Sequence, residues 1–137
     1  MTPDDVAPLT EAPFFTAAAR VFLADRHLAT LSTTLTDGTI HVVPVGFIVV
    51  GSTATVITSR LSQKVLNVRR SPHATICQVD GARWLTVVGV ARIEEGATSV
   101  AEAVERYAGR YRQPRPNPER VVIVVEIERI LGLSSLG

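Results

Sequence analysis

One short segment of the chain collects the residue types that bind a compact anion. Lys64 is the only lysine among 14 lysines and arginines, and Ser59, Ser62 and Gln63 stand close before it. An ammonium is a strongly hydrated point charge on a flexible stem, whereas a guanidinium is a rigid planar fork. A helix that begins near Ser62 would add free backbone N–H groups to the hydroxyl and amide donors. The segment therefore predicts a phosphate site, with a solvated surface lysine as the alternative.

The charge around this segment is positive, although the whole chain is nearly neutral. The 137 residues carry a formal net charge of +1. The stretch from position 51 to 83 has one acid, Asp80, and five basic residues, which are Arg60, Lys64, Arg69, Arg70 and Arg83. A nearly neutral chain argues against general nucleic-acid binding, and no aromatic residues interleave with these charges to stack on bases. We therefore expect a small anionic ligand and no nucleic acid.

Other chemistries find little support in the sequence. His, Cys, Asp and Glu residues do not occur at metal-ligand spacing, and the chain has neither a glycine-rich nucleotide loop nor a nucleophile elbow. We expect no metal and assign no catalytic residue. His41 could donate a proton, but a single histidine in a strand is more often structural.

Cys77 is the only cysteine, so an intramolecular disulfide is excluded. We expect its thiol to be a small buried side chain in a protein of the reducing cytoplasm.

The length and hydropathy predict one domain over residues 1–137, with residues 1–12 as a mobile N-terminal segment. The longest apolar runs are far too short to span a bilayer. The first residues lack the basic start and apolar core of a signal peptide. We therefore expect a cytoplasmic protein that does not bind membranes.

The pattern of apolar residues predicts a mainly β protein with three helices. The helices are expected at 14–25, 63–69 and 97–111, and the strands at 28–35, 40–50, 54–59, 75–79, 84–93 and 120–130. Asp37-Gly38 and Asp80-Gly81 are turn sequences that make hairpins of the strands on either side. Six strands joined mostly by tight turns predict an antiparallel sheet, closed or nearly closed into a barrel.

Pro44 lies inside one of these strands and has no N–H to donate to a neighbouring strand. The strand 40–50 is therefore expected at an edge of the sheet, or broken near the proline. A broken strand leaves backbone groups free to bind a ligand. An edge proline without a role is the alternative.

The order of four motifs resembles the split β-barrel of the pyridoxamine-phosphate-oxidase-like flavoproteins. The motifs are His41-Val-Val-Pro-Val-Gly46, a strand ending Ile57-Thr-Ser59, Ser62-Gln-Lys64 before a helix, and Cys77-Gln-Val-Asp-Gly-Ala-Arg-Trp84. Within this superfamily the chain is more similar to the branch that uses the deazaflavin coenzyme F420. The stretches 77–85, 105–118 and 121–132 resemble the F420-dependent biliverdin reductases of that branch. The resemblance implies a six-stranded antiparallel split β-barrel of the FMN-binding type.

The same resemblance implies where a cofactor would bind. Val43, Pro44 and Val45 would lie along the deazaflavin ring, with Ile57 and Thr58 beside them. The phosphate would be held by Ser59, Arg60, Gln63 and Lys64. Trp84 would approach the cofactor, with an aromatic core residue as the alternative reading.

The resemblance further implies a homodimer that transfers hydride from reduced F420 to a conjugated acceptor, with biliverdin as the expected acceptor and bilirubin as the product. Arginines at 60, 69, 83 and 115 could pair with the propionates of such a substrate. Two alternatives stay open. The cofactor could be FMN in a pyridoxamine-phosphate-oxidase-like enzyme, or the protein could be a non-catalytic carrier of deazaflavin or haem.

Overall fold

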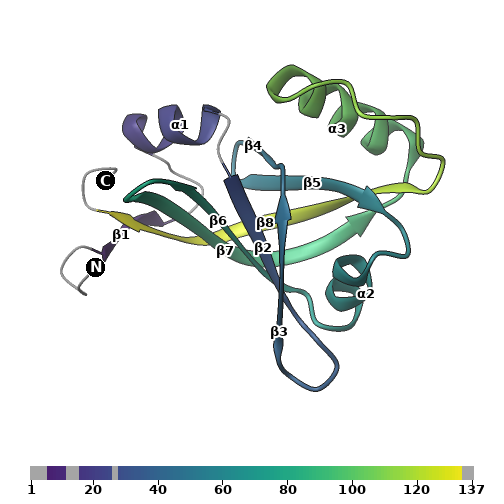
Figure 1. Ribbon diagram of the computed structural model, residues 1–137, viewed down its shortest axis with the longest axis horizontal. Coiled ribbons are helices and arrows are strands. Elements are labelled where there is room, and N and C mark those ends of the chain that lie inside the picture. The colour runs from purple at the N-terminus through teal and green to yellow at the C-terminus, as the bar shows by residue number, and fades with distance from the viewer. Residues whose placement is uncertain (1–5, 12–15, 26–27, 134–137) are drawn as a thin grey trace.

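We describe a computed structural model of the chain, which defines residues 6–11, 16–25 and 28–133 (Figure 1). These residues form eight strands and three helices around one antiparallel sheet. In chain order the elements are β1 (Val6–Glu11), α1 (Ala17–Ala24), β2 (Leu28–Thr34), β3 (Ile40–Val45), β4 (Ile48–Val50), β5 (Thr53–Ser59), α2 (Gln63–Arg70), β6 (His73–Asp80), β7 (Arg83–Glu94), α3 (Ala97–Arg110) and β8 (Arg120–Leu133). The predicted mainly β class and all three predicted helices are confirmed.

The single strand predicted over 40–50 is divided into β3 and β4, which lie at opposite ends of the sheet. The strand order is β3-β2-β6-β7-β8-β5-β4, so β3 pairs only with β2 and β4 pairs only with β5. Gly46 and Phe47 connect the two strands, and the chain itself therefore joins the two ends of the sheet. When β3 and β4 are counted together, the barrel has the predicted six strands.

β1 is an additional strand that the sequence did not indicate. It pairs with the end of β8, with Val6 opposite Leu133 and Glu11 opposite Arg129. Residues 6–11 belong to the segment expected to be mobile, and that mobility stays a prediction. The segment contains Pro8 and shows no regular alternation, which is why its pairing could not be foreseen.

The barrel interior is filled by side chains from alternate positions of the strands. On β2 every second residue is buried, and on β6 the buried residues are Ala74, Ile76 and Gln78. Cys77 lies on the other face of β6 and is half-buried, so the expectation of a buried thiol is wrong. The reason is the two-residue period of a strand, which places neighbours on opposite faces.

Gly89 allows the two longest strands to bend around the barrel. The β7–β8 register shifts between Val88 and Gly89, which marks a bulge. A Cβ atom at Gly89 would lie 2.0 Å from the backbone oxygen of Glu126, which leaves no room for any side chain. Glycine is therefore required for this close approach of the two strands.

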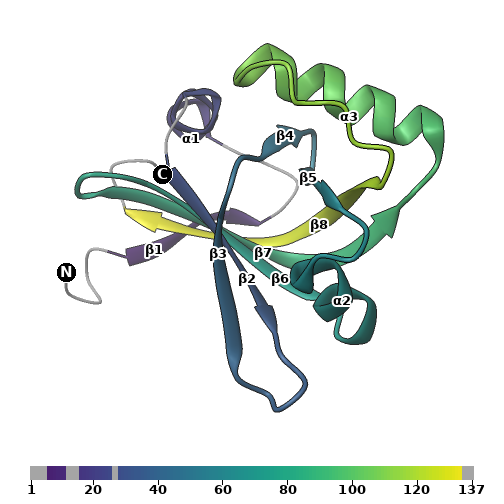
Figure 2. The same cartoon turned by 45° about the vertical axis from the view of Figure 1, so that its right-hand side comes forward.

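The three helices lie outside the barrel, as the two ribbon views show (Figures 1 and 2). α1 begins after Thr16, whose hydroxyl accepts the N–H of Ala19 at 3.1 Å. The expected start of this helix at 14 lies outside the described residues. α2 ends before Pro72, and α3 lies near β4 and β5. None of the helices in the described part of the chain is long and apolar enough to cross a membrane.

Candidate cofactor site

Two strands, β3 and the second half of β5, each have a neighbouring strand on one side only, close to the connection between β3 and β4. β3 has β2 on one side and no strand on the other. β5 pairs with β4 only as far as Thr55, opposite Ile48, so beyond Thr55 it has β8 on one side only. If the β4–β5 register continued, Val45 would stand opposite Thr58. We call this unpaired gap between β3 and the second half of β5 the seam.

Six of the ten predicted cofactor residues lie on the two strand edges that border the seam. Val43, Pro44 and Val45 are on the β3 edge, and Ile57, Thr58 and Ser59 are on the β5 edge. The strand predicted over 40–50 was expected at an edge of the sheet or broken near Pro44, and the structure confirms both. β3 is an edge strand, and it ends one residue after the proline.

The bend at Gly46–Phe47 is held by the end of α3 instead of by a neighbouring strand. The N–H of Phe47 donates to the Tyr111 hydroxyl at 3.1 Å, and its carbonyl accepts a hydrogen bond from the Arg110 guanidinium. Arg110 also donates to the Asp25 carbonyl at 2.5 Å and to Gln78 Oε1 at 2.7 Å. These contacts supply the hydrogen bonds that a strand ladder would otherwise make. Local sequence patterns do not predict these contacts, because they join residues that are 32 to 85 positions apart.

Aromatic rings pack directly on the bend. The rings of Tyr107 and Tyr111 lie 4.7 Å apart, and a Cβ at Gly46 would come within 3.0 Å of the first and 3.1 Å of the second. A cavity of about 400 Å³ lies beside them, bordered by Pro44 and Val45. Its size falls in the range of small-molecule sites. The β3 residues that were expected along a cofactor ring therefore border an aromatic hollow.

Lys64 lies in the first turn of α2, which follows the β5 edge of the seam after a short connection. Its side chain is half-buried, and burial lowers the pKa of the ammonium below its usual value. It forms no ion pair or hydrogen bond with any residue that the structure describes. Ser62 precedes the helix and makes no side-chain cap to it, while the Thr58 hydroxyl donates to the Ser62 hydroxyl at 3.2 Å. The helix start therefore combines a cation, hydroxyl groups and uncapped N–H groups.

Gln63 and Arg60, two of the other predicted phosphate ligands, have partners within the protein. Gln63 Nε2 donates to Asn67 Oδ1 at 2.7 Å, and Asn67 Nδ2 donates to the buried Thr33 hydroxyl at 3.0 Å. This chain of bonds ties α2 to β2. Arg60 forms an exposed ion pair with Glu119. Exposed ion pairs are weak, so a role of Arg60 in phosphate binding stays a prediction.

Trp84 lies at the opposite end of β6 from α2 and Lys64. It is half-buried and pairs with Val79 near the β6–β7 turn, while His73 and Val90 pair at the opposite end, where α2 leads into β6. Six residues of strand separate the two ends, which is about 20 Å. Trp84 therefore lies far from Lys64 along β6, and its contact with a cofactor stays a prediction.

The remaining predicted candidates have ordinary surroundings. His41 is half-buried on β3, and its Nδ1 has no hydrogen-bond partner among the described residues. Arg69 pairs with Glu95 at 3.3 Å, and Arg83 pairs with Asp80 at 3.9 Å. These two arginines are thus partly neutralised. No cluster of three or more metal-ligating side chains occurs in the described part of the chain.

The fold and the seam define a class of protein, an antiparallel split β-barrel with two unpaired strand edges and a half-buried lysine in the helix that follows one of them. The chain belongs to the pyridoxamine 5'-phosphate oxidase family, whose sequence profile matches residues 15–134. It is 52% identical over 120 residues to the F420H(2)-dependent biliverdin reductase of Mycobacterium tuberculosis, covering 86% of this chain and 88% of that protein.

Solved structures share the fold at lower sequence identity. A conserved hypothetical protein of Mycobacterium tuberculosis is similar with a TM-score of 0.73 and 23% identity, covering 88% of this chain and 86% of that one. An F420 reductase is similar with a TM-score of 0.69 and 24% identity, covering 81% and 94%. The predicted split-barrel fold is confirmed.

Proposed function

We propose that the chain is an oxidoreductase that binds coenzyme F420 along the seam and uses its reduced form to reduce biliverdin to bilirubin. The observation that carries the proposal is the meeting of two unpaired strand edges with Lys64, whose ammonium has no partner among the described residues. The 52% identity to an F420H(2)-dependent biliverdin reductase supports both the cofactor and the acceptor.

The donor set of the seam fits a deazaflavin. Such a cofactor combines a flat ring that has a polar rim with a phosphate on a flexible tail. The free backbone groups of β3 and β5 can bond the ring's polar rim, and half-buried Val45 and Ile57 offer apolar contact to its faces. Lys64 and the first N–H groups of α2 can bond the phosphate.

When bound, the reduced deazaflavin supplies a hydride and does not readily pass single electrons to oxygen. The protein must then hold the acceptor within about 3–3.5 Å of the ring and keep water away. The bend at Phe47 keeps Val43–Val45 in place, because Arg110 and Tyr111 fix its backbone from α3. The cavity beside Tyr107 and Tyr111 offers the acceptor an aromatic surface next to that strand.

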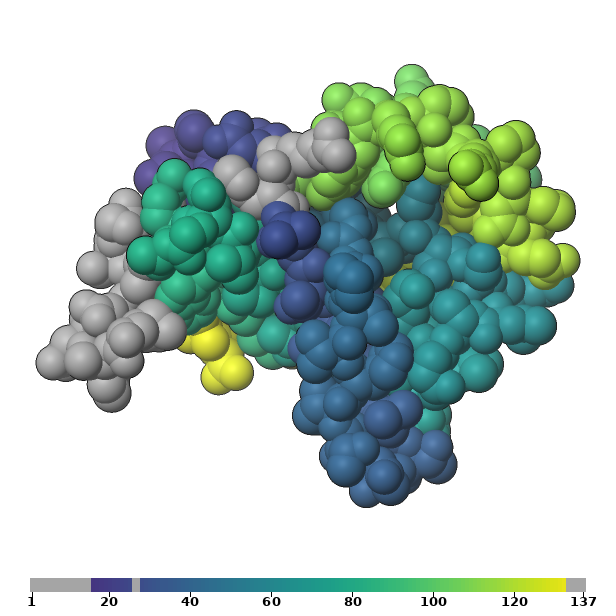
Figure 3. All heavy atoms as spheres, viewed as in Figure 1, coloured from purple at the N-terminus to yellow at the C-terminus, as the bar shows by residue number. Residues whose placement is uncertain are grey.

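We also propose that two chains assemble to complete the site, in a cytoplasmic homodimer. Large apolar side chains are exposed at Ile40 and Val42 of β3, which belongs to the hairpin that projects from the rest of the molecule (Figure 3). Leu61, just before α2, and Leu66 of α2 are also exposed. Such side chains are expected to be covered in a dimer, and the second chain would then bring Trp84 toward the seam. Light scattering at micromolar concentration should report a dimer, and a monomer would remove Trp84 from the site.

A single-turnover experiment tests the function. Protein loaded with stoichiometric reduced F420 is mixed with biliverdin, and cofactor oxidation and bilirubin formation are followed together. We expect both to proceed at one rate, far above the rate without protein. If oxidation by biliverdin, quinones and enones only matches that control, the protein is a carrier. If FMN binds and F420 does not, the enzyme is of the flavin type.

A further inference from the structure

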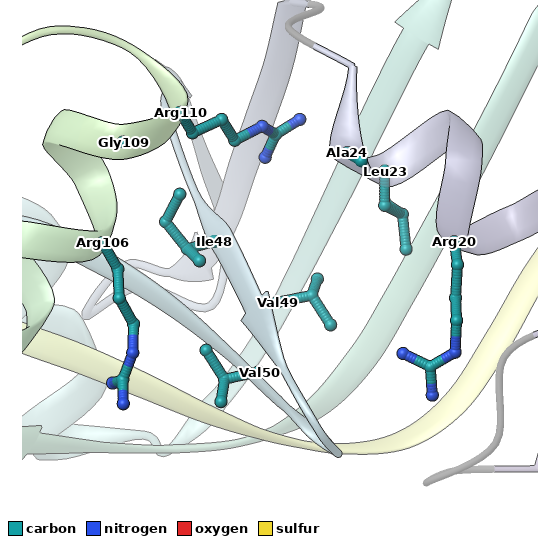
Figure 4. Close-up of a pocket in the computed structure, with 9 residues that line it drawn as sticks. All are labelled: Arg20, Leu23, Ala24, Ile48, Val49, Val50, Arg106, Gly109 and Arg110. Atoms are coloured by element: carbon teal, nitrogen blue, oxygen red, sulfur yellow. The ribbon is translucent and has the colours of Figure 1, made fainter.

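A second cavity lies between α1, α3 and β4, away from the seam. Its volume is about 460 Å³, and Figure 4 shows the residues that line it. The apolar wall is formed by Ile48, Val49 and Val50 of β4 together with Leu23 of α1. None of the ten predicted cofactor residues lines this cavity.

Three arginines border the apolar wall, Arg20 from α1 and Arg106 and Arg110 from α3. Arg20 and Arg106 lie on either side of Val50, and Arg110 lies toward the other end of β4 (Figure 4). No aspartate or glutamate is among the described residues that line the cavity. An apolar cavity bordered by one sign of charge raises the local concentration of oppositely charged ligands.

The positive charge of this cavity is only partly balanced by the protein. Arg106 is exposed and has no ion pair or hydrogen bond with any described residue. Arg110 donates to two backbone carbonyls and an amide oxygen, all neutral, and its buried Nε lacks a partner in the described part of the chain. The pKa of Arg110 is lowered by burial, against which the charge of Asp25 raises it. A bound anion would be stabilised mainly by the exposed guanidinium of Arg106.

We propose that this cavity binds an apolar molecule that carries a carboxylate. The apolar body lies along Ile48 and Val50, and the carboxylate lies beside the guanidinium of Arg106, which borders Val50 (Figure 4). The volume falls within the usual range for a small-molecule site. A fatty acid and the propionate arm of a tetrapyrrole share this chemistry, and the experiment below separates them.

Calorimetry on the full-length, F420-loaded protein tests the proposal with decanoate, decanol and decyltrimethylammonium as probes. We expect decanoate to bind at least about tenfold more tightly than the alcohol or the cation, the effect of one charge-assisted hydrogen bond. Arg106→Gln should remove that advantage. The control variant Arg112→Gln removes the same charge from an exposed arginine that does not line the cavity, and this variant should bind decanoate like the parent protein.

Biliverdin and its dimethyl ester form a second pair of probes. If the protein prefers the free acid and Arg106→Gln removes that preference, the natural ligand is the tetrapyrrole.

Ala24→Phe keeps the charge and fills the cavity from the exposed side of α1, so it should abolish decanoate binding without affecting folding. The proposal is overturned if decanoate binds no better than decanol, or if the two arginine variants bind it equally. It is also overturned if Arg106→Gln or Ala24→Phe dissociates a dimer while decanoate binding is unchanged, because the face then belongs to a second copy of the chain. None of these outcomes depends on the hydride-transfer assay, so the reductase proposal stands or fails separately.

Discussion

Two half-buried cations serve the seam, and they differ in what their donors bind. At the bend, Arg110 donates to the Phe47 and Asp25 carbonyls and to the amide oxygen of Gln78. At the start of α2, Lys64 binds none of the described residues, and burial lowers its pKa. Most N–H donors of Arg110 bond to other parts of the protein, whereas the ammonium of Lys64 is available to a ligand. A cation close to a site therefore indicates binding only when its donors are free.

The chemistry of arginine and lysine suits these two different roles. The planar guanidinium of Arg110 donates to acceptors in three separate segments, and its central carbon lies 4.9 Å from the centre of the Phe47 ring. An ammonium could not hold these acceptors in fixed directions. Lys64 has a flexible stem and one compact charge, which suits a phosphate that arrives from solution.

The largest expected effect is at the bend. Arg110→Ala should lower the free energy of unfolding by about 3 kcal/mol, because each hydrogen bond from a charged group contributes about 1.5–3 kcal/mol and the Oε1 atom of buried Gln78 loses its donor. Urea denaturation at neutral pH measures the change. Arg106→Ala, one turn earlier on α3 and exposed, is the control and should stay within about 0.5 kcal/mol. Equal values for the two variants would contradict the structural role of Arg110.

A smaller effect is expected where α2 is tied to the barrel. Gln63→Ala leaves the buried Asn67 carbonyl oxygen without its donor, which should lower the free energy of unfolding by about 1 kcal/mol. Cofactor affinity should fall less than for loss of Lys64, because Gln63 mainly anchors the helix. Denaturation and a cofactor titration on the same protein measure both. A larger loss of affinity with unchanged stability would make Gln63 a direct phosphate ligand.

The smallest expected effect is a pH dependence of the protein without cofactor. The pKa of Lys64 is lower in the folded state than its ordinary value of 10.5, so the unfolded chain holds more protons between the two values. Stability from this group must then rise as the pH rises through the folded pKa toward 10.5. Lys64→Met should remove this rise, which denaturation across that alkaline window measures against the parent protein. A profile unchanged by the substitution would place Lys64 in full solvent.

The sequence predicts the individual helices and turns better than the long-range contacts between them. The three helices and the hairpin turns at Gly38 and Gly81 depend on local patterns, and both glycines adopt the positive φ that such turns need. The bend at Gly46–Phe47 depends on Arg110 and Tyr111, more than sixty residues away, so the sequence showed only that Pro44 could not continue a ladder. β1 has no local signal, since its pairing with β8 alone defines it.

In the candidate site, the sequence shows which residues are charged but not which of them have partners in the folded protein. Lys64 stands out in the sequence because it is the only lysine, and the structure leaves it unpartnered among the described residues. Arg60 is equally close to the seam in sequence, but Glu119, 59 positions further along the chain, binds it. The arginines at 69 and 83, expected near a substrate, also have acidic partners. Which cations are free is a property of the folded chain, and residue type alone does not predict it.

The affinity of F420 for Lys64→Ala is the most direct test of the proposed site. Fluorescence titration should show a loss of about 1.5–3 kcal/mol, roughly 10- to 150-fold in the dissociation constant, with the free energy of unfolding not lowered. Arg60→Ala, which removes an exposed and already paired cation from the same segment, should change the constant far less. A dissociation constant for Lys64→Ala equal to that of the parent protein would contradict the account and leave Lys64 as a surface charge.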